Sequence, residues 1–337
     1  MKKFITLLLA LALLAAVISG CGRDGSRTDG TGADGADDLT REIVVKLPTI
    51  QSGGPALIAL ELGFFEEQNL KIEQIGSVPG GNQIQSVITG DIDFTLGNHT
   101  DREIQALVSG IPVKVILAQS ETTQDMPHMR WMVPEDSGIH EPKDLIGKKI
   151  AMSYITGGCP VTNLREYLRK GGVDLKQVQM VQMDDHLQAA ALQEGLVDVI
   201  TVHAPLSGVV RKQLNLRTLF SDYDTFDTRA GNNVATSEKV IKADPEKVRR
   251  FSAAFVKAQK WINENQEEAS RIYAEFLKLD PALVKDFDRT FYSETGLETD
   301  ERVQLWIDEL ITLGEIKPGQ FKPSDIYTNE FNPNYKK

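Results

Sequence analysis

The sequence predicts an α/β fold of two lobes, and three observations support this prediction. From Arg41 onward, short β-branched runs alternate with amphipathic helical patterns, which is typical of a parallel sheet with helices on its faces. A second series with the same rhythm starts after Met126. About 300 residues follow residue 40, which is enough chain to bury two hydrophobic cores. We therefore expect two lobes of the same class.

The first series predicts four strands with helices between them. We expect strands at residues 42–49, 70–77, 92–98 and 113–120, and helices at residues 56–63, 80–90 and 101–110. Pro55 begins the first helix, where proline is well tolerated, and Gly63 ends it.

The second series predicts four more strands, and the chain after it becomes mainly helical. The expected strands lie at 130–135, 148–154, 178–184 and 197–203, with helices at 162–172 and 187–195. One further strand is expected within 231–242, followed by helices at 245–265, 266–278, 281–292 and 300–314. Val248, Phe251, Phe255 and Ala258 share one face of a helix, which indicates core packing rather than a ligand cage.

The N-terminus predicts an export signal and a lipid anchor. Lys2 and Lys3 precede a short apolar run that ends in Ile-Ser-Gly-Cys21, similar to a bacterial lipobox, so we expect a signal peptide at 1–20 and lipidation of Cys21. An ordinary signal peptide with a chance cysteine is the alternative. Residues 21–40 are almost entirely small or polar and predict a flexible tether. The mature protein is then expected outside the cytoplasm, held at the cell membrane by its lipid.

Composition restricts the partners that the chain can have. A formal net charge of −11 and the lack of a basic run argue against nucleic acid. Cys159 is the only other cysteine, so no intramolecular disulfide can form once Cys21 is lipidated. His99, His186 and His203 are far apart in sequence, which does not favour a metal site, and we expect no cofactor.

The candidate binding residues lie in loops that follow the predicted strands, because ligands of parallel α/β sheets bind beyond the carboxyl ends of the strands. These loops are 49–54, 79–82, 97–101, 156–161, 184–186 and 203–205. Gly80 and Gly81 begin one helix, and Gly157 and Gly158 begin another, so that free backbone N–H groups could hold an anion. Tight turns without a ligand are the alternative, and neither loop matches a P-loop or dinucleotide fingerprint.

Cys159 and the pair Asp184 and Asp185 need separate interpretations. Cys159 could be a nucleophile only with a base nearby, and no acyl-transfer motif surrounds it, so we expect a small polarisable side chain that lines a pocket. One carboxylate of the pair could hold an ammonium group, although capping of the next helix is an equal alternative.

Five segments occur in an order that carries a family resemblance. They are residues 56–73, 81–98, 131–153, 166–183 and 191–205, and they include "LGFFEEQNL", "TGDIDF" and "VPEDSGI" with "DLIGKKIA". Together with the lipobox, this set resembles the substrate-binding proteins of ABC importers in the nitrate, sulfonate, taurine and bicarbonate group, which also includes binders of thiamine precursors and riboflavin.

The resemblance implies a two-lobed clamp of the type II periplasmic-binding-protein class with two crossovers between lobes. Lobe 1 would comprise residues 41–119 and 228–337, and lobe 2 residues 120–227. The implied partners are a small-molecule solute and an importer permease, and we expect a monomer. The implied ligand residues are Gln51, Ser52, Gly80, Gly81, Asn98, His99, Gly157, Gly158, Cys159, Pro160, His203, Pro205 and Asn232, to which the carboxylate argument adds Asp184.

Two departures from the family pattern bear on the ligand. Sulfonate binders commonly have a small hydroxylic residue where Gly158 and Cys159 stand, and a tryptophan where His203 precedes Ala-Pro. These departures set the chain apart from the sulfonate binders, while the resemblance as a whole implies capture of a small anionic or zwitterionic solute. The alternatives are a thiamine-precursor or other heteroaromatic binder, an enzyme of related fold that uses Cys159, and an input module for a membrane sensor.

Overall fold

A computed structural model describes residues 39–50, 54–155, 157–226 and 231–336. The predicted signal peptide, Cys21 and nearly all of the predicted tether lie outside these ranges, as do Gln51 and Ser52. Residues 39–337 form one unit of the chain. No helix in the described ranges combines the length and apolar character needed to cross a bilayer.

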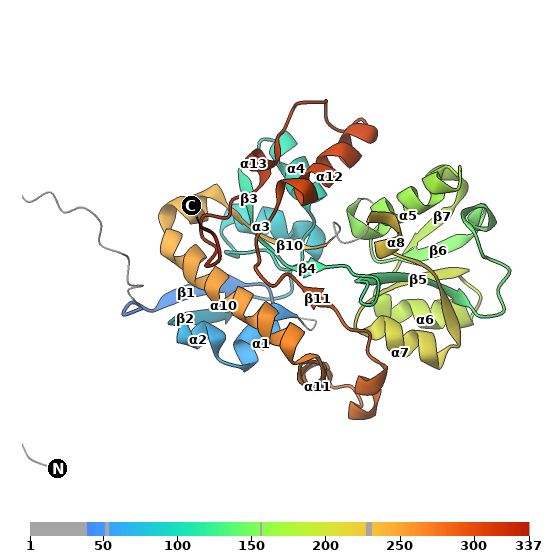
Figure 1. The fold of residues 1–337 in the computed structure, drawn as a ribbon, viewed down its shortest axis with the longest axis horizontal. Helices are drawn as coiled ribbons and strands as arrows, with labels where there is room; N and C mark the ends of the chain where they lie inside the picture. The colour runs from blue at the N-terminus through green and yellow to red at the C-terminus, as the bar shows by residue number, and fades with distance from the viewer. Residues whose placement is uncertain (1–38, 51–53, 156, 227–230, 337) are drawn as a thin grey trace, which may run out of the picture. The chain divides into compact units, whose positions relative to one another are not determined.

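Two small sheets organise lobe 1, at the left of Figure 1. In the first, β1 (Ile43–Leu47) pairs in parallel with β2 (Leu70–Gln74), and α1 (Pro55–Glu61) and α2 (Phe64–Glu67) connect them. In the second, β3 (Val113–Ala118) pairs in antiparallel fashion with β10 (Asn233–Ser237).

The core of lobe 1 forms where α10 (Pro245–Glu264) packs against α1 and α2. Phe251 stacks on Phe94 with ring centroids 4.0 Å apart, and also on Phe65. Phe251 and Phe255 are both buried, as the helical spacing predicts. The C-terminal half of the chain therefore completes the core that the first elements begin.

The expected strand at 92–98 does not form a regular strand. The amide of Asp93 donates to the Lys46 carbonyl of β1, and that of Thr95 to the Ala235 carbonyl of β10. In return, the side chains of Asp93 and Thr95 accept from the amides of Lys46 and Ala235 at 2.7 and 2.8 Å. Side chains thus replace the ladder bonds, and the segment links the two small sheets.

Lobe 2, at the right of Figure 1, contains a five-stranded sheet in the order β7-β6-β8-β5-β9. Its strands are β5 (Met129–Pro134), β6 (Lys149–Met152), β7 (Gln179–Gln182), β8 (Val199–His203) and β9 (Leu216–Ser221). The expectation of a parallel sheet is wrong for β5, which is antiparallel to both β8 and β9. The reason is the chain path, since β5 carries the chain in from the crossover and not from a helix of the same lobe.

Three helices pack on this sheet: α5 (Gly158–Lys170), α6 (Asp185–Gln193) and α7 (Leu206–Gln213). Under α5, Tyr167, Phe220 and Trp131 form a continuous stack with centroid distances of 3.8 and 4.3 Å. Aromatic stacking of this kind contributes beyond area burial and fixes α5 on the sheet.

The outgoing and returning crossovers lie side by side. The amide of Gln119 donates to the Asn232 carbonyl at 2.8 Å, and the Asn232 amide donates to Ser120 Oγ at 3.2 Å. Gly231 packs so tightly against the Ser120 carbonyl that a Cβ would clash with it. Sheet membership separates the lobes at these crossovers, while the boundaries at 119/120 and 227/228 stay predictions.

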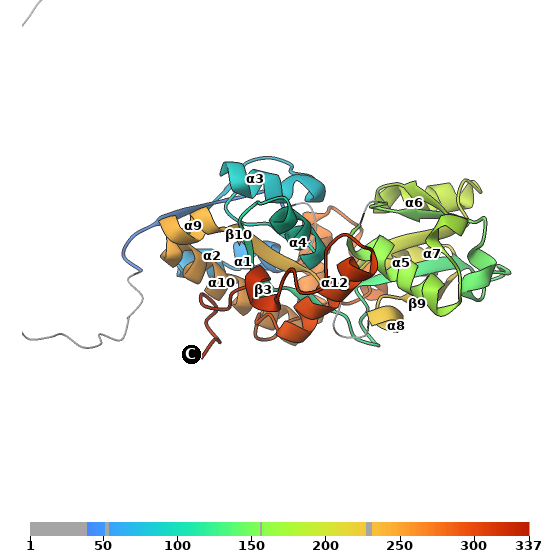
Figure 2. The ribbon, with the colours of Figure 1, turned by 90° about the horizontal axis from the view of Figure 1, so that it is seen from above.

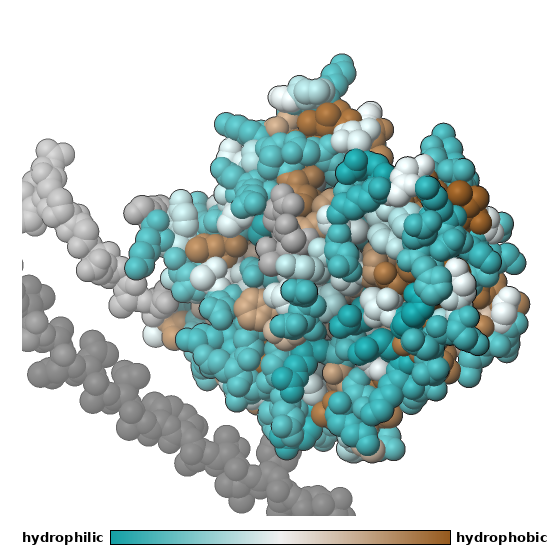
Figure 3. Space-filling view, turned by 45° about the vertical axis from the view of Figure 1, so that its right-hand side comes forward, coloured by the Kyte–Doolittle hydropathy of each residue, from teal (hydrophilic) through white to brown (hydrophobic). Residues whose placement is uncertain are grey.

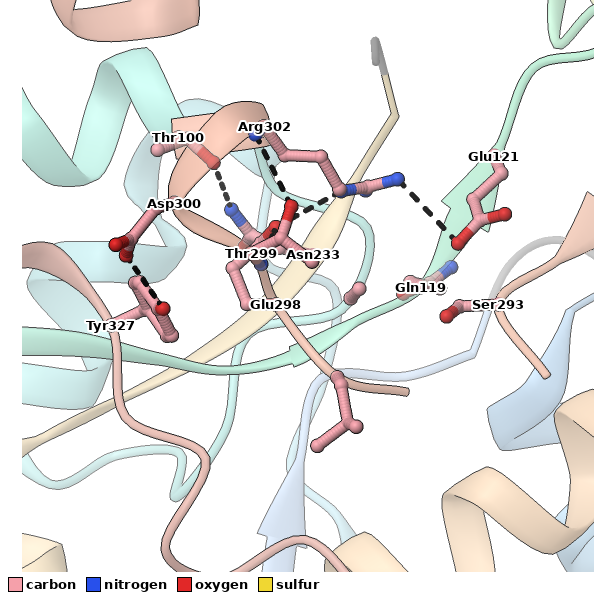
Figure 4. Close-up of polar contacts among 12 residues, drawn as sticks. Thr100, Gln119, Glu121, Asn233, Ser293, Glu298, Thr299, Asp300, Arg302 and Tyr327 are labelled. Carbon is pink, nitrogen blue, oxygen red and sulfur yellow. Dashed lines mark hydrogen bonds and ion pairs between the residues drawn. The ribbon is translucent and has the colours of Figure 1, made fainter. Parts of the chain in front are cut away.

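Arg302 fastens the crossovers to α12 (Asp300–Thr312), as Figure 4 shows. Its Nε donates to Glu298 Oε1 at 2.9 Å, and its Nη1 lies 3.7 Å from Glu121 Oε1 in β4 (Ser120–Glu121). β4 in turn pairs with β11 (Phe291–Tyr292). The crossover region is therefore held by α12, by the residues just before it and by β11.

Two expected elements take another form. The expected helix at 281–292 is only a 3₁₀ helix at Pro281–Asp286 followed by β11, because Asp286 and Asp288 are engaged by lobe 2. The segment 231–242 divides at Ser237, whose Oγ accepts from the Val240 amide and begins a helix.

The remaining helices complete the two lobes, and Figure 2 shows several of them from above. They are α3 (Gln83–Thr89), α4 (Thr100–Val108), α8 (Tyr223–Phe226), α9 (Glu238–Ala243), α11 (Gln266–Phe276) and α13 (Pro323–Ile326). On the face in Figure 3, hydrophilic residues cover most of the surface and hydrophobic residues form separate patches.

Candidate functional site

The candidate site lies where α4 of lobe 1 meets the start of α5 of lobe 2. Asp101, in the first turn of α4, accepts a hydrogen bond through Oδ2 from the Gly158 amide at 2.8 Å. This bond joins two of the strand-end loops that the sequence singles out, 97–101 and 156–161. It is also the cap of α5, because no side chain of its own N-cap residue, Gly157, can serve.

The chain can start α5 at this point because Gly157 and Gly158 adopt φ values of 72° and 75°. A side chain is strained in this left-handed region, whereas glycine is not. A Cβ on Gly157 would lie 3.5 Å from Asp101 Oδ2. The two glycines therefore allow the lobe 1 carboxylate to reach the backbone of lobe 2.

Asp101 is buried, and its environment is electrostatically unusual. Desolvation raises its pKa to about 6, although the bond from the Gly158 amide and the charge of Arg102 oppose the shift. Its second oxygen, Oδ1, is buried and has no hydrogen-bond partner among the residues that the structure describes. A buried acceptor without a partner is costly in a folded protein, so this oxygen is available to a donor from outside the chain.

Arg102 lies between the two glycine-rich helix starts. Its guanidinium carbon is 4.6 Å from the centre of the Tyr154 ring, which belongs to lobe 2. A Cβ on Gly158 would lie 3.3 Å from Nη2, and one on Gly81 would lie 4.0 Å from Nη1. Within the described ranges, the guanidinium makes neither a hydrogen bond nor an ion pair. It is a cation whose donors are unused.

Glu103, two residues further along α4, is fully buried. Its two carboxylate oxygens accept from the side-chain amides of Asn98 at 2.6 Å and Asn233 at 3.2 Å. Desolvation raises its pKa to about 8 against these hydrogen bonds, and the charge of Asp101 adds to the rise. Glu103 thus ties the 97–101 loop to the returning crossover.

Three histidines are close enough to influence one another's pKa. His99 precedes α4, and its Nδ1 is buried without a hydrogen-bond partner in the described part of the chain. Burial lowers the pKa of His99 well below its usual value, and the charges of Arg102, His128 and His203 add to the effect. His128 is edge-on to His203 with ring centroids 5.1 Å apart, and burial lowers the pKa of His128 to about 3.

His203, at the end of β8, pairs with the second carboxylate of the 184–186 loop. Its Nδ1 lies 2.7 Å from Asp185 Oδ2, and its amide donates to the same oxygen at 3.1 Å. Burial alone would lower the pKa of His203, but the charge of Asp185 and their hydrogen bond raise it. Asp184, the carboxylate that the sequence analysis favoured for a solute ammonium group, is exposed and makes no capping bond, and its solute contact stays a prediction.

Cys159 lies in the hydrophobic core of lobe 2 and is fully buried. Asn163 Nδ2 donates to its carbonyl oxygen at 2.8 Å and lies 3.2 Å from its Sγ. Burial raises the pKa of the thiol well above its usual value, and the charges of Asp222 and Asp101 raise it further. A thiol that stays protonated is a poor nucleophile. Whether its sulfur contacts a solute stays a prediction.

The other predicted residues are placed as follows. Gly80 and Gly81 belong to a short 3₁₀ helix, Gly80–Asn82, before α3. Asn98 is bridged to Asn233, and Asn232 Oδ1 accepts from the Ser120 hydroxyl in the crossover pair. The side-chain NH₂ of Asn98 and the side-chain oxygen of Asn232 are therefore already used inside the protein. No triad of His, Cys, Asp or Glu in the described ranges has a geometry that would hold a metal ion.

The sequence analysis missed Arg102 and Glu103 as site residues, and it included Asp101 only as the last residue of the loop 97–101. "DREIQALVSG" has the pattern of an ordinary surface helix, and acidic residues in a first turn are common. The one usable signal is that this charged triplet begins within the strand-end loop at 97–101.

A second contact between the lobes lies at Asp288. Its Oδ2 accepts from Arg130 Nε at 2.8 Å and from Ser207 Oγ at 2.7 Å, and Arg211 Nη2 lies 3.4 Å from its Oδ1. The amide of Asp288 donates to the Pro205 carbonyl at 3.0 Å. A cavity of about 20 Å³ beside it, enough for one water, is lined by Pro205, Ser270, Tyr273 and Tyr292 among others.

Comparison with known proteins identifies the family. The family model described as NMT1/THI5 like matches residues 52–269, which is more than half of the chain. The chain belongs to the NMT1/THI5-like family. The resemblance found in the sequence is thereby confirmed.

Relatives of this family member include both binding proteins and an enzyme. A putative aliphatic sulfonates-binding protein of Bacillus subtilis (strain 168) is 26% identical over 292 residues, covering 85% of this chain and 82% of the relative. The 4-amino-5-hydroxymethyl-2-methylpyrimidine phosphate synthase of Legionella pneumophila is 23% identical over 292 residues, covering 83% and 88%.

Solved structures show the fold of this family member. The alkanesulfonate-binding protein of Xanthomonas axonopodis pv. citri, bound to MOPS, matches with a TM-score of 0.68 at 16% identity, covering 85% of this chain and 98% of that chain. The predicted fold class, a two-lobed α/β clamp of the periplasmic-binding-protein type, is confirmed.

Proposed function

We propose that this protein is the extracytoplasmic solute-binding lipoprotein of an ABC importer. It captures a small anionic or zwitterionic solute between its lobes and delivers it to the permease. The observation that carries the proposal is the α4–α5 contact, where lobe 1 presents to lobe 2 buried polar atoms that lack partners among the described residues. These atoms are Asp101 Oδ1 and His99 Nδ1, beside the unused guanidinium of Arg102, which lies over the Tyr154 ring of lobe 2. Such atoms are expected where a polar ligand completes the hydrogen bonding.

Capture follows from the position of this contact. A solute at α4 and α5 touches both lobes only when the lobes are together, so binding favours the closed state. The family membership and the similarity to a sulfonate-binding relative support a sulfonate-, taurine- or nitrate-like solute. An ammonium end, if present, would meet Asp184 or Asp185, of which Asp185 already holds His203.

Anchoring is the second part of the proposal. Cys21 would carry the lipid, with acyl chains such as palmitate, and the body would work as a monomer at the outer face of the membrane. Membrane fractionation of cells that express wild type or Cys21→Ala tests this part. We expect the variant in the soluble or secreted fraction, and equal membrane retention of both forms would contradict it.

Ligand binding to the purified protein tests solute capture. The protein is stripped of copurifying ligand by unfolding and refolding, then examined with taurine, short alkanesulfonates, nitrate and a pyrimidine. We expect a thermal shift and a decrease in radius of gyration with at least one anion. Native mass spectrometry of the protein before stripping identifies a retained solute. No shift and no compaction with any anion would contradict the proposal.

The Legionella synthase gives reason to test a second candidate, an enzyme or a binder of the heteroaromatic class. The raised pKa of the Cys159 thiol does not support a nucleophile. Replacement of Cys159 by serine separates the alternatives: a receptor would change at most in affinity. Loss of a measurable turnover in that variant would favour the enzyme.

A further inference from the structure

We propose that Arg102 selects the anionic end of the solute, and that the helix start at Gly158 does not. This inference rests on the proposed function, because it assigns one end of the solute within the same site. It differs from the expectation drawn from the sequence, in which the backbone N–H groups at the two glycine-rich helix starts hold the anion.

The Gly158 amide is already occupied by a carboxylate of the protein. Asp101 Oδ2 accepts from it at 2.8 Å, inside a buried contact. An anionic solute at the same amide would have to displace Asp101 or lie against its negative charge. Like charges at such distances oppose each other strongly where water is excluded. The first turn of α5 is therefore closed to a second anion.

Arg102 offers unused hydrogen-bond donors and a positive charge, which the helix start at Gly158 lacks. Its guanidinium has donors in a planar fork, which matches two oxygens of a sulfonate or carboxylate at once. It has no acceptor among the residues that the structure describes, whereas Arg130 and Arg302 both pair with carboxylates. The absence of side chains at Gly81 and Gly158 keeps the space beside Nη1 and Nη2 open.

Tyr154 gives this cation a defined orientation and couples it to lobe 2. The guanidinium carbon lies 4.6 Å from the ring centre, within the range of a cation–π contact. Stacking leaves the edge of the guanidinium, where its N–H groups point, free for an oxyanion. Because Arg102 belongs to lobe 1 and Tyr154 to lobe 2, an anion bound to Arg102 lies at the junction that closure forms.

The experiment compares four forms of the full mature protein: wild type, Arg102→Gln, Arg102→Lys and the control Arg165→Gln. Arg165 also joins the lobes, through Glu309 at 2.6 Å, but has its own acceptor. Calorimetric titrations use an alkanesulfonate that binds wild type and the uncharged sulfonamide of the same chain. Circular dichroism and thermal unfolding check that each variant is folded.

We expect Arg102→Gln to weaken sulfonate binding about 100-fold, as for the loss of hydrogen bonds to a charged group. Arg102→Lys should weaken it about 10-fold, because the charge remains but the fork is lost. Arg165→Gln should change it less than about threefold, as for a partly exposed ion pair. The affinity for the sulfonamide should be equal in wild type and Arg102→Gln.

Tyr154→Leu is a second variant that does not alter Arg102. It should weaken sulfonate binding about fivefold through loss of the cation–π contact. Unchanged sulfonate affinity in Arg102→Gln would overturn the inference while the proposed function stands. Recovery of binding in Arg102→Gln by added Asp101→Asn would assign the anion to the helix start, and would also overturn it. Failure of wild type to bind any anion would instead contradict the proposed function.

Discussion

The contacts between the lobes at Asp288 and at Asp101 differ in how completely their polar groups are satisfied. At Asp288, both carboxylate oxygens and the amide have partners in lobe 2. At Asp101 and Arg102, one carboxylate oxygen and the whole guanidinium have none among the described residues. A fully partnered contact gains nothing by separating, whereas an incompletely partnered one is completed by a ligand. The first contact is suited to permanent attachment, and the second to capture and release.

The largest expected effect comes from breaking the Asp288 contact. Asp288→Ala leaves the mostly buried Arg130 without its anion, and we expect the free energy of unfolding to fall by about 4 kcal/mol. Urea unfolding followed by circular dichroism measures this. The exposed pair Lys242 and Glu238 provides the control, since Glu238→Gln should cost less than about 0.5 kcal/mol. If Asp288→Ala and Glu238→Gln lowered the free energy of unfolding equally, the Asp288 contact would not be a structural attachment.

A smaller loss of stability is expected from a substitution that introduces a steric clash at the same contact without changing a charge. Gly208 of α7 packs against the backbone of the 286–288 segment, so that a Cβ would clash with the Asp286 carbonyl and lie 2.8 Å from the Asp288 amide. Gly208→Ala should reduce the free energy of unfolding by about 2 kcal/mol. Gly138 has open space around its position, and Gly138→Ala is the matched control. An unchanged free energy of unfolding in Gly208→Ala would mean that the 286–288 segment can move to accommodate the methyl group.

Stability contributed by the α4 contact is expected to depend on pH, because α4 carries buried carboxyl groups with raised pKa values. Burial raises the pKa of Glu103 from 4.5 to about 8, so between these values the folded chain keeps a proton that the unfolded chain releases. Stability from this group therefore falls as pH rises through that window. Asp101 behaves in the same way only up to about pH 6. The raised pKa of His203 gives a loss of stability of the same sign above pH 6.5, so the contribution of Glu103 is isolated by comparison with a variant of that residue.

Glu103→Gln should remove this dependence. Compared with wild type, the variant should gain about 1–2 kcal/mol in relative free energy of unfolding between pH 6 and pH 8. Urea titrations of both proteins at the two pH values measure the difference. A constant difference across the interval would show that Glu103 does not carry its proton in the folded protein.

Local pattern predicted most elements of the fold. The alternation of β-branched runs and amphipathic helices located α1, α5, α6, α10 and the lobe 2 strands β5 to β8, but it did not locate β9. The antiparallel direction of β5 was not predictable, because it depends on where the crossover enters the lobe and not on residue spacing. The 3₁₀ helix at 281–286 was missed because Asp286 and Asp288 are held by residues more than 70 positions away.

The site was predictable at the level of loops but not of side chains. The strand-end rule selected the loops at 97–101, 156–161 and 203–205, in which the structure places Asp101, Gly158 and His203. It did not distinguish Asp185 from Asp184, since a shift of one residue at a helix start decides which carboxylate turns toward His203. Nor could it identify Arg102, because an arginine in a first helical turn is usually solvated, and its contact with Tyr154 depends on the position of the opposite lobe.

The attachment at Asp288 also limits how far the clamp can open. Four residues further on, Tyr292 pairs with β4 in the crossover, and the side-chain amide of Asn263 in lobe 1 donates to the Tyr292 carbonyl at 2.7 Å. Even fully extended, a four-residue stretch reaches only about 14 Å. As long as the contacts at Asp288 and Tyr292 persist, this short segment and the paired crossovers keep the lobes close together at one edge of the cleft. The largest separation of the lobes in the open state is then expected at α4 and α5, so we expect the solute to enter at that edge.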